Sequence, residues 1–373
     1  MAPSSFNPTN VNLDTANLRD VYCYIQATKN DYNGQLGARI SALFVILVIS
    51  TAVTFFPVLA TRVRRLKIPL YVYLFARYFG AGVIVATAFI HLLDPAYAEI
   101  GPDTCVGQTK GWAEYSWPPA IALTSCIATF LLDFAAERYV EKKYGYAHGT
   151  SETQDASAMR HGSCLQSHQF MHSADQDQTG PAKASTKGSE AGADLEALSV
   201  GTGKEHALEQ SFRQQIAAFL ILEFGVIFHS VIIGLTLGTA GSEFADLYPV
   251  LVFHQSFEGL GIGARLSAIP FPTRLRWMPW ALCTAYGLTT PIAIAAGLGV
   301  RTTYNSGSFT ANVVSGVLDS TSAGILLYTG LVELLARDFL FNPDRTRDDR
   351  QLTFMTVSML FGCGIMALLG KWA

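Results

Sequence analysis

The chain has 373 residues, of which 50% are hydrophobic and only 15% are charged, against roughly a quarter charged in soluble domains. Its formal net charge of −3 offers no strongly basic surface, so we expect no nucleic-acid partner. The apolar residues come in long blocks with the charges between them, a pattern typical of a polytopic protein within a lipid bilayer.

Polar residues fill positions 1–39 before the first apolar block begins. A cleaved signal peptide would instead open with a short basic stretch and a short apolar core. We therefore interpret the first block as a retained membrane span and residues 1–39 as a tail.

Eight stretches reach the length of about 20 apolar residues that a helix needs to cross a bilayer. They are 40–60, 71–93, 118–137, 214–239, 247–264, 279–300, 311–332 and 352–370. The fold class predicted is an all-α membrane bundle of eight helices, with the first three in 40–141 and the last five in 212–373.

The connecting segments differ in basic charge. Most of the 26 lysines and arginines follow the first, third, fifth and seventh spans, as in the segment TRVRRLK after the first. Basic residues accumulate on the cytoplasmic side of a membrane. Both termini, including the tail of residues 1–39, are therefore expected outside.

Residues 142–211 form the one long loop, and we expect it to be cytoplasmic and mostly disordered because it is rich in Gly, Ser, Ala, Gln and Thr. It contains or adjoins His148, His161, His168, His172 and His206, with Cys164 among them. Two interpretations stay open: a solvated tether with incidental histidines, or weak, exchangeable metal binding. The spacing is too irregular for a closed structural zinc site.

Two cysteines, Cys23 and Cys105, fall on the expected outer side, where a disulfide can persist. A bond between them would tether the N-terminal tail to the loop between the second and third spans. The sequence leaves this pairing open.

Ionisable residues inside spans are costly and are candidates for function. His254 and Glu258 are four residues apart in the fifth span, so on a helix both face one side and can reach one ion. His229 is near the middle of the fourth span, with Gly234 and Gly238 spaced to let a neighbouring helix approach.

A short connection makes the fourth and fifth spans antiparallel neighbours, with His229 at the depth of His254 and Glu258. Two imidazoles and a carboxylate would form an open zinc site. The alternative is that each polar group merely hydrogen-bonds to a neighbouring helix.

Other polar residues mark the ends of a path. His91 and Asp94, at the outer end of the second span, are candidates for a metal entrance, whereas Glu99 is expected as an exposed loop carboxylate. Glu333, at the inner end of the seventh span, is a candidate exit residue or the partner of Arg337 at i+4. Glu223 is six residues before His229, so we expect it on a different side of the helix and nearer the cytoplasm, with roles in helix packing and in release both left open.

Four segments carry a resemblance to a known family. HSVIIGLTLG and HQSFEGLGIG resemble the signature helices of the ZIP (ZRT/IRT-like) metal transporters, and ATAFIHLLDPAYAE and DSTSAGILLYTGLVELL resemble that family's second and seventh helices. The likeness covers nearly the whole chain and is of the fungal zinc-regulated type. It implies the ZIP fold, with a primary site formed by His229, His254 and Glu258.

Some ZIP proteins hold a second metal beside the first. The corresponding positions here are the neutral Ser230, Ile233, Gln255 and Thr290. We therefore expect a single-ion site, to which Ser230 and Gln255 could lend oxygen ligands.

The resemblance implies zinc uptake into the cytoplasm, most simply across the plasma membrane. Zinc is then the transported substrate and not a cofactor, and the chain is not an enzyme. The alternative substrate is iron, or a broad range of Zn²⁺, Fe²⁺ and Mn²⁺. A homodimer is one possible assembly of the chain. A membrane-embedded zinc hydrolase and a metal-sensing receptor are rivals from other classes, although the HExxH pattern of many zinc hydrolases is absent.

Overall fold

The computed structural model describes residues 9–12, 16–26, 32–63, 69–144, 190–341 and 346–372. For 190–211, 214, 140, 141, 143 and 144 it describes the backbone only. The candidate loop ligands His148, His161, His168 and His172 lie outside the described residues, so their metal binding stays a prediction.

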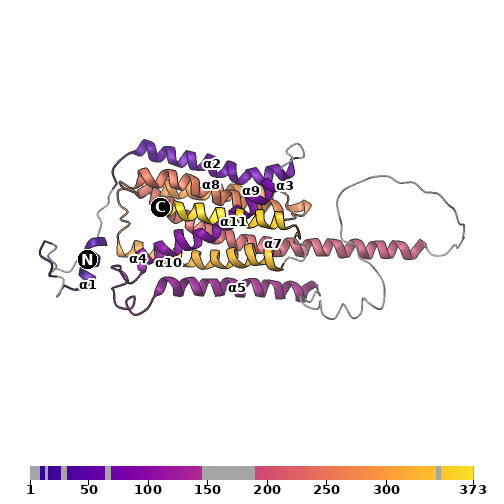
Figure 1. Cartoon of the computed structure of the whole chain (residues 1–373), viewed down its shortest axis with the longest axis horizontal. Coiled ribbons are helices and arrows are strands. Elements are labelled where there is room, and N and C mark those ends of the chain that lie inside the picture. Colours follow the sequence, from indigo (N-terminus) through magenta and orange to yellow (C-terminus); the bar gives the residue numbers. More distant parts are fainter. Residues whose placement is uncertain are drawn as a thin grey trace. The chain divides into compact units, whose positions relative to one another are not determined.

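The chain divides into two compact units, residues 1–134 with 212–373 and residues 135–211. Figure 1 labels most of the helices named below. The first unit holds every helix discussed below, except that α5 and α7 each continue into the second. Within the second unit, α5 extends to Tyr144 and α7 starts at Glu190. The helix α7 thus takes in residues 190–211, which the composition predicts as part of the loop.

All secondary-structure elements among the described residues are helices, and the segments between them are turns and loops. The elements are α1 (Leu18–Gln26), α2 (Leu36–Arg62), α3 (Leu70–Ala86), η1 (Thr87–Leu93), α4 (Asp94–Ile100), α5 (Trp117–Tyr144), α7 (Glu190–Thr239), α8 (Phe244–Ala268), η2 (Thr273–Leu275), α9 (Met278–Val300), α10 (Phe309–Tyr328), η3 (Thr329–Phe341) and α11 (Asp349–Leu369). All eight apolar stretches expected to span the membrane lie in helices, apart from Gly370 at the end of the last one, and this confirms the all-α bundle.

Six helical segments in the described part of the chain are long and apolar enough to cross a membrane. They are Leu36–Arg62, Leu70–Ile100, Trp117–Tyr139, Gln215–Thr239, Thr273–Val300 and Asp349–Leu369. The two other expected spans coincide with α8 and with α10 and η3. These helices bury polar side chains such as Glu258 and Asp319, which lowers their hydropathy. The count of eight spans stays a prediction.

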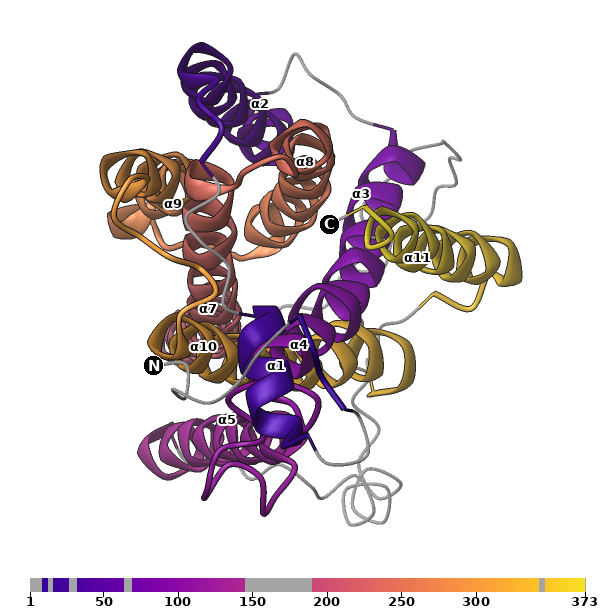
Figure 2. The same cartoon turned by 90° about the vertical axis from the view of Figure 1, so that its left-hand side faces the viewer.

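Glycines set the closest helix contacts. The helix α8 packs between α2 and α3, and α3 also packs on α11 (Figure 2). A Cβ on Gly80 of α3 would collide with the Cα of Gly261 in α8. The two backbones therefore touch, which explains why small residues fill this part of α8.

The glycines after His229 behave as the sequence predicts. A Cβ on Gly234 would lie 2.6 Å from Cβ of Ala293, and one on Gly238 would lie 2.9 Å from Cα of Gly297. Both neighbours are on α9. Close approach of a helix at these glycines is therefore confirmed, and the approaching helix is α9.

Two segments are π-helical, η1 in the second expected span and η3 after α10. In η1 a cause is visible, because Pro95 has no N–H to donate to the carbonyl of His91 four residues earlier. Such segments often occur at functional sites, and η1 carries His91 whereas η3 carries Glu333.

A disulfide joins Cys23 of α1 to Cys105, which confirms the pairing that the sequence left open. Gln26 supports the same junction, since its side chain accepts a hydrogen bond from the Cys105 amide at 2.5 Å and donates one to the Ala98 carbonyl at 3.3 Å. The N-terminal helix is therefore attached to the segment that follows α4.

Candidate metal transport site

The helices α7 and α8 run antiparallel and bring the predicted ligands together. Leu237, near the end of α7, packs in one cluster with Phe244 at the start of α8. Phe219, earlier in α7, packs in another cluster with Leu266 near the end of α8. His229 and His254 lie between these two contacts and face each other across the two helices.

The three candidate ligand atoms lie at distances that suit one ion. Nε2 of His229 is 3.2 Å from Nε2 of His254, and Nε2 of His254 is 3.3 Å from Oε1 of Glu258. Each pair of ligand atoms at tetrahedral angles around zinc, with bonds of about 2.0–2.1 Å, would be about 3.3 Å apart. All three atoms lie within 4.8 Å of one another. The side chains therefore form a donor set close to the geometry that zinc prefers.

These side chains are buried and short of partners. Glu258 is 0% exposed and both imidazoles are 1% exposed. Neither carboxylate oxygen of Glu258 nor Nδ1 of His229 has a hydrogen-bond partner among the described residues. The buried Glu258 carboxylate has an imidazole nitrogen of His254 at 3.3 Å. Burial of a charge is costly unless it is paired, so this arrangement fits side chains that receive a cation.

A cavity of about 380 Å³ reaches the site from one side. Its lining includes His229 and His254 together with His91 and Asp94, the two residues predicted as an entrance. The structure thus joins the expected entrance to the expected site in one continuous space. Asp94 is exposed and His91 is buried.

His91 is held in place from another helix. Its Nε2 lies 3.1 Å from the carbonyl oxygen of Met366 in α11. Because a carbonyl only accepts, Nε2 carries the proton when the ring is neutral, and Nδ1 keeps the lone pair that a metal needs.

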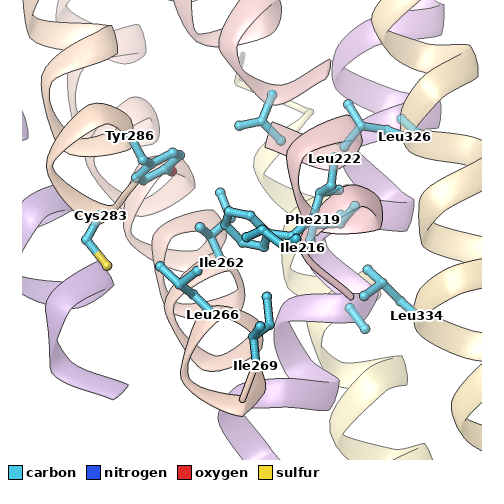
Figure 3. Close-up of a cluster of buried hydrophobic side chains, with 14 of the residues drawn as sticks. Ile216, Phe219, Leu222, Ile262, Leu266, Ile269, Cys283, Tyr286, Leu326 and Leu334 are labelled. Carbon is cyan, nitrogen blue, oxygen red and sulfur yellow. The ribbon is translucent and has the colours of Figure 1, made fainter. Parts of the chain in front are cut away.

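Apolar side chains close the opposite side of the site. Phe219 and Leu222 of α7 pack with Ile262 and Leu266 of α8 in the cluster shown in Figure 3. Cys283 of α9 belongs to the same cluster and is 0% exposed. The site is therefore accessible from the cavity and covered on the side away from it.

Beyond this cluster lies Glu333, the predicted exit residue. Its carboxylate accepts a hydrogen bond from Arg337 at 2.8 Å and lies 3.8 Å from Arg265 of α8. Arg337 also lies 3.9 Å from Asp133 of α5, which accepts a hydrogen bond from Tyr328. The i+4 ion pair that the sequence offered as an alternative is therefore present.

The positions proposed for auxiliary ligands differ from one another. The Gln255 side-chain oxygen accepts a hydrogen bond from Tyr286 at 2.9 Å and is directed to α9. Ser230 and Thr290 are buried, and their hydroxyls have no hydrogen-bond partner among the described residues. Ser230 is therefore freer than Gln255 to contribute an oxygen.

One expectation for the outer side is wrong. Glu99 is not an exposed loop carboxylate, because α4 continues the second span to Ile100 and turns Glu99 into the cavity. The cavity is also lined by Asp319 of α10, which sequence reasoning missed. The signal was available, since Asp319 is an acid within an expected span.

Comparison with known proteins identifies the family. A model of the ZIP zinc transporter family matches residues 36–370. The chain is 59% identical to zinc-regulated transporter 1 of Saccharomyces cerevisiae, over 99% of this chain and 97% of that protein. It is 41% identical to zinc-regulated transporter 1 of Schizosaccharomyces pombe, over 92% and 88%, and 36% identical to zinc-regulated transporter 2 of S. cerevisiae, over 92% and 96%. The chain belongs to the ZIP zinc transporter family, whose members are transporters and not enzymes.

Proposed function

We propose that this protein carries zinc across the plasma membrane into the cytoplasm, and that each ion passes through a single site made by His229, His254 and Glu258. The observation that carries the proposal is the spacing of the three ligand atoms, at 3.2 Å and 3.3 Å across two helices. The yeast relatives named as zinc-regulated transporters support zinc as the substrate.

The donor set suits a transported ion. Two imidazoles and one carboxylate replace part of the water that zinc loses, and the charge of Glu258 offsets that of the ion. A structural zinc site closes with four protein ligands, whereas three leave a position open. An incomplete set favours release over permanent binding.

The orientation of the pathway is supported by the basic residues together with the cavity, and inward movement is taken from the family. The Thr239 end of α7 lines the cavity, and Arg265 follows the site at the opposite end of α8. If basic residues mark the cytoplasmic side, the cavity opens outward and the cluster of Phe219, Leu222, Ile262 and Leu266 closes the inner path. Zinc then enters past His91 and Asp94, and its release requires the inner cluster to part beside Glu333.

Uptake of radioactive zinc into sealed vesicles that contain the purified protein tests this proposal. We expect uptake by the natural sequence and none by His229→Ala or Glu258→Ala. Ser256→Ala is the matched control on α8, because its hydroxyl donates to the Val252 carbonyl of the same helix. Equal uptake by the natural protein and both ligand variants would overturn the proposal.

The same vesicles decide between zinc and iron. Imidazole and carboxylate also bind Fe²⁺ and Mn²⁺, so each metal is added as a competitor of labelled zinc. We expect Zn²⁺ to compete most strongly. Stronger competition by Fe²⁺ would make iron the substrate. A homodimer stays a prediction.

A further inference from the structure

The cavity outside the central site is lined by more acidic side chains than the proposed transport path includes. Asp94, Glu99 and Asp319 all line it, and none of its lining residues is lysine or arginine. Three carboxylates thus face one space of about 380 Å³ without a basic side chain in its wall.

Asp319 is the most unusual of the three. It is only 4% exposed, and its Oδ1 has no hydrogen-bond partner among the described residues. A buried carboxylate oxygen without a hydrogen-bond partner is destabilising in a low-dielectric region. A cation that enters through the cavity would remove that destabilisation.

Glu99 reaches the same place from another helix. A Cβ on Gly316 of α10 would lie 2.7 Å from Cγ2 of Ile100, so only glycine lets α4 pack this closely on α10. Glu99 of α4 and Asp319 of α10 both line the cavity. The Glu99 and Asp319 charges are close enough to interact. Oε2 of Glu99 is buried and without a hydrogen-bond partner among the described residues.

From this geometry we propose that Glu99 and Asp319 form a second, outer cation site, which holds a hydrated divalent ion before it reaches the central site. The inference rests on the proposed function, since the ion is the one to be transported. The donors are all oxygen atoms, which accept Zn²⁺ and Mn²⁺ with little discrimination, whereas the two central imidazoles favour zinc. The outer site concentrates divalent ions, and the central site selects among them.

The first test counts bound zinc on the purified protein over a series of zinc concentrations. We expect two ions on the natural protein and one on the variant that combines His229→Ala with Glu258→Ala. Adding Asp319→Asn or Glu99→Gln to that variant should remove the remaining ion, and Mn²⁺ should displace it. Glu114→Gln is the matched control, because Glu114 is an exposed acid that does not line the cavity.

A single ion on the natural protein and none on the double central variant would overturn the outer site. The outer site would also be overturned if Asp319→Asn and Glu99→Gln left the number of bound zinc ions unchanged. That result is expected of carboxyl groups that stay protonated and bind no cation. The comparison of the natural protein with the double central variant decides the question even if Asp319→Asn does not fold.

The second test separates the outer site from the proposed function. In vesicles, Asp319→Asn and Glu99→Gln should raise the KM for zinc by about tenfold, which corresponds to about 1.4 kcal/mol, and leave the maximal rate within about twofold. Absence of uptake by the natural protein would refute the transport function itself. Normal uptake by the natural protein together with unchanged KM in both variants would refute the outer site alone.

Discussion

The imidazole rings of His91 and His254 meet edge to face with their centres 4.9 Å apart, although they belong to η1 and α8. His254 in turn lies 3.2 Å from His229 through the Nε2 atoms. Three histidines from three helices thus form a continuous row at the inner end of the cavity. An ion that leaves His91 has the next imidazole within a few ångströms.

Alanine substitutions in this row of histidines should impair zinc uptake to different degrees. His91→Ala should raise the KM for zinc by about threefold to tenfold, since one transient ligand is lost and the three central ligands remain. His254→Ala should abolish uptake because it removes the ligand shared by both contacts. Initial rates over a zinc series measure both effects. A complete loss in His91→Ala with normal amounts of folded protein would place His91 in the central site.

Substitutions can separate the effect of the Glu258 charge on transport from the effect of its shape. Glu258→Gln keeps the side-chain volume and one oxygen atom but loses the negative charge that offsets the charge of the ion. Glu258 is 0% exposed, so water cannot take over this role. We expect zinc uptake to fall at least about tenfold. Glu258→Asp should recover part of it, because the charge returns on a shorter side chain. Near-normal uptake by Glu258→Gln would show that charge compensation comes from elsewhere.

Arg39, which is distant from the site, should contribute to the stability of the fold. Its guanidinium is 0% exposed and donates to the carbonyls of Leu237, Gly238 and Ala240 at the end of α7. Arg39→Ala would leave these buried carbonyls without donors, at a cost of about 2–4 kcal/mol. Thermal unfolding of the purified protein should show a lower Tm, only partly recovered in Arg39→Lys, which has a single donor group. An unchanged Tm would mean that water replaces the guanidinium.

The disulfide between Cys23 and Cys105 predicts a local effect and also tests orientation. A membrane-impermeant reductant added to intact cells should open it, because both residues are expected outside. Zinc uptake should persist, since neither residue lines the cavity, while proteolysis of α1 should become faster. The variant Cys23→Ser with Cys105→Ser is the control and should not respond to reductant. Reduction only after the membrane is permeabilised would reverse the predicted orientation.

Cys283 provides a probe of the inner closure. It is 0% exposed within the cluster that covers the site, so a thiol reagent should modify it slowly in the resting protein. During zinc uptake the rate should rise, because the cluster must part for release. Cys126, Cys164 and Cys363 are replaced by serine so that the measured modification rate reports on Cys283 alone. Thr236→Cys, in the cavity wall, should instead react rapidly at rest. An equal rate at Cys283 with and without zinc would contradict inner opening.

The sequence alone determined what depends on local spacing. A helix places residues four apart on one face, so His254 and Glu258 had to be neighbours wherever α8 packed. Long apolar blocks had to become helices in a membrane, because backbone groups find no partner in lipid. The pattern of small residues after His229 likewise required a close helix contact, and four motif segments carried the family.

Tertiary structure decided everything that depends on which helices meet. Spacing within α7 could not show that α9 is the helix that approaches Gly234, or that apolar residues cover one side of the site. No motif or spacing joins Glu99 to Asp319, which are more than two hundred residues apart. Only the extension of the second span through η1 and α4, and the contact of Ile100 with Gly316, brings these two acids to one cavity. Long-range packing therefore decided how the central site is reached.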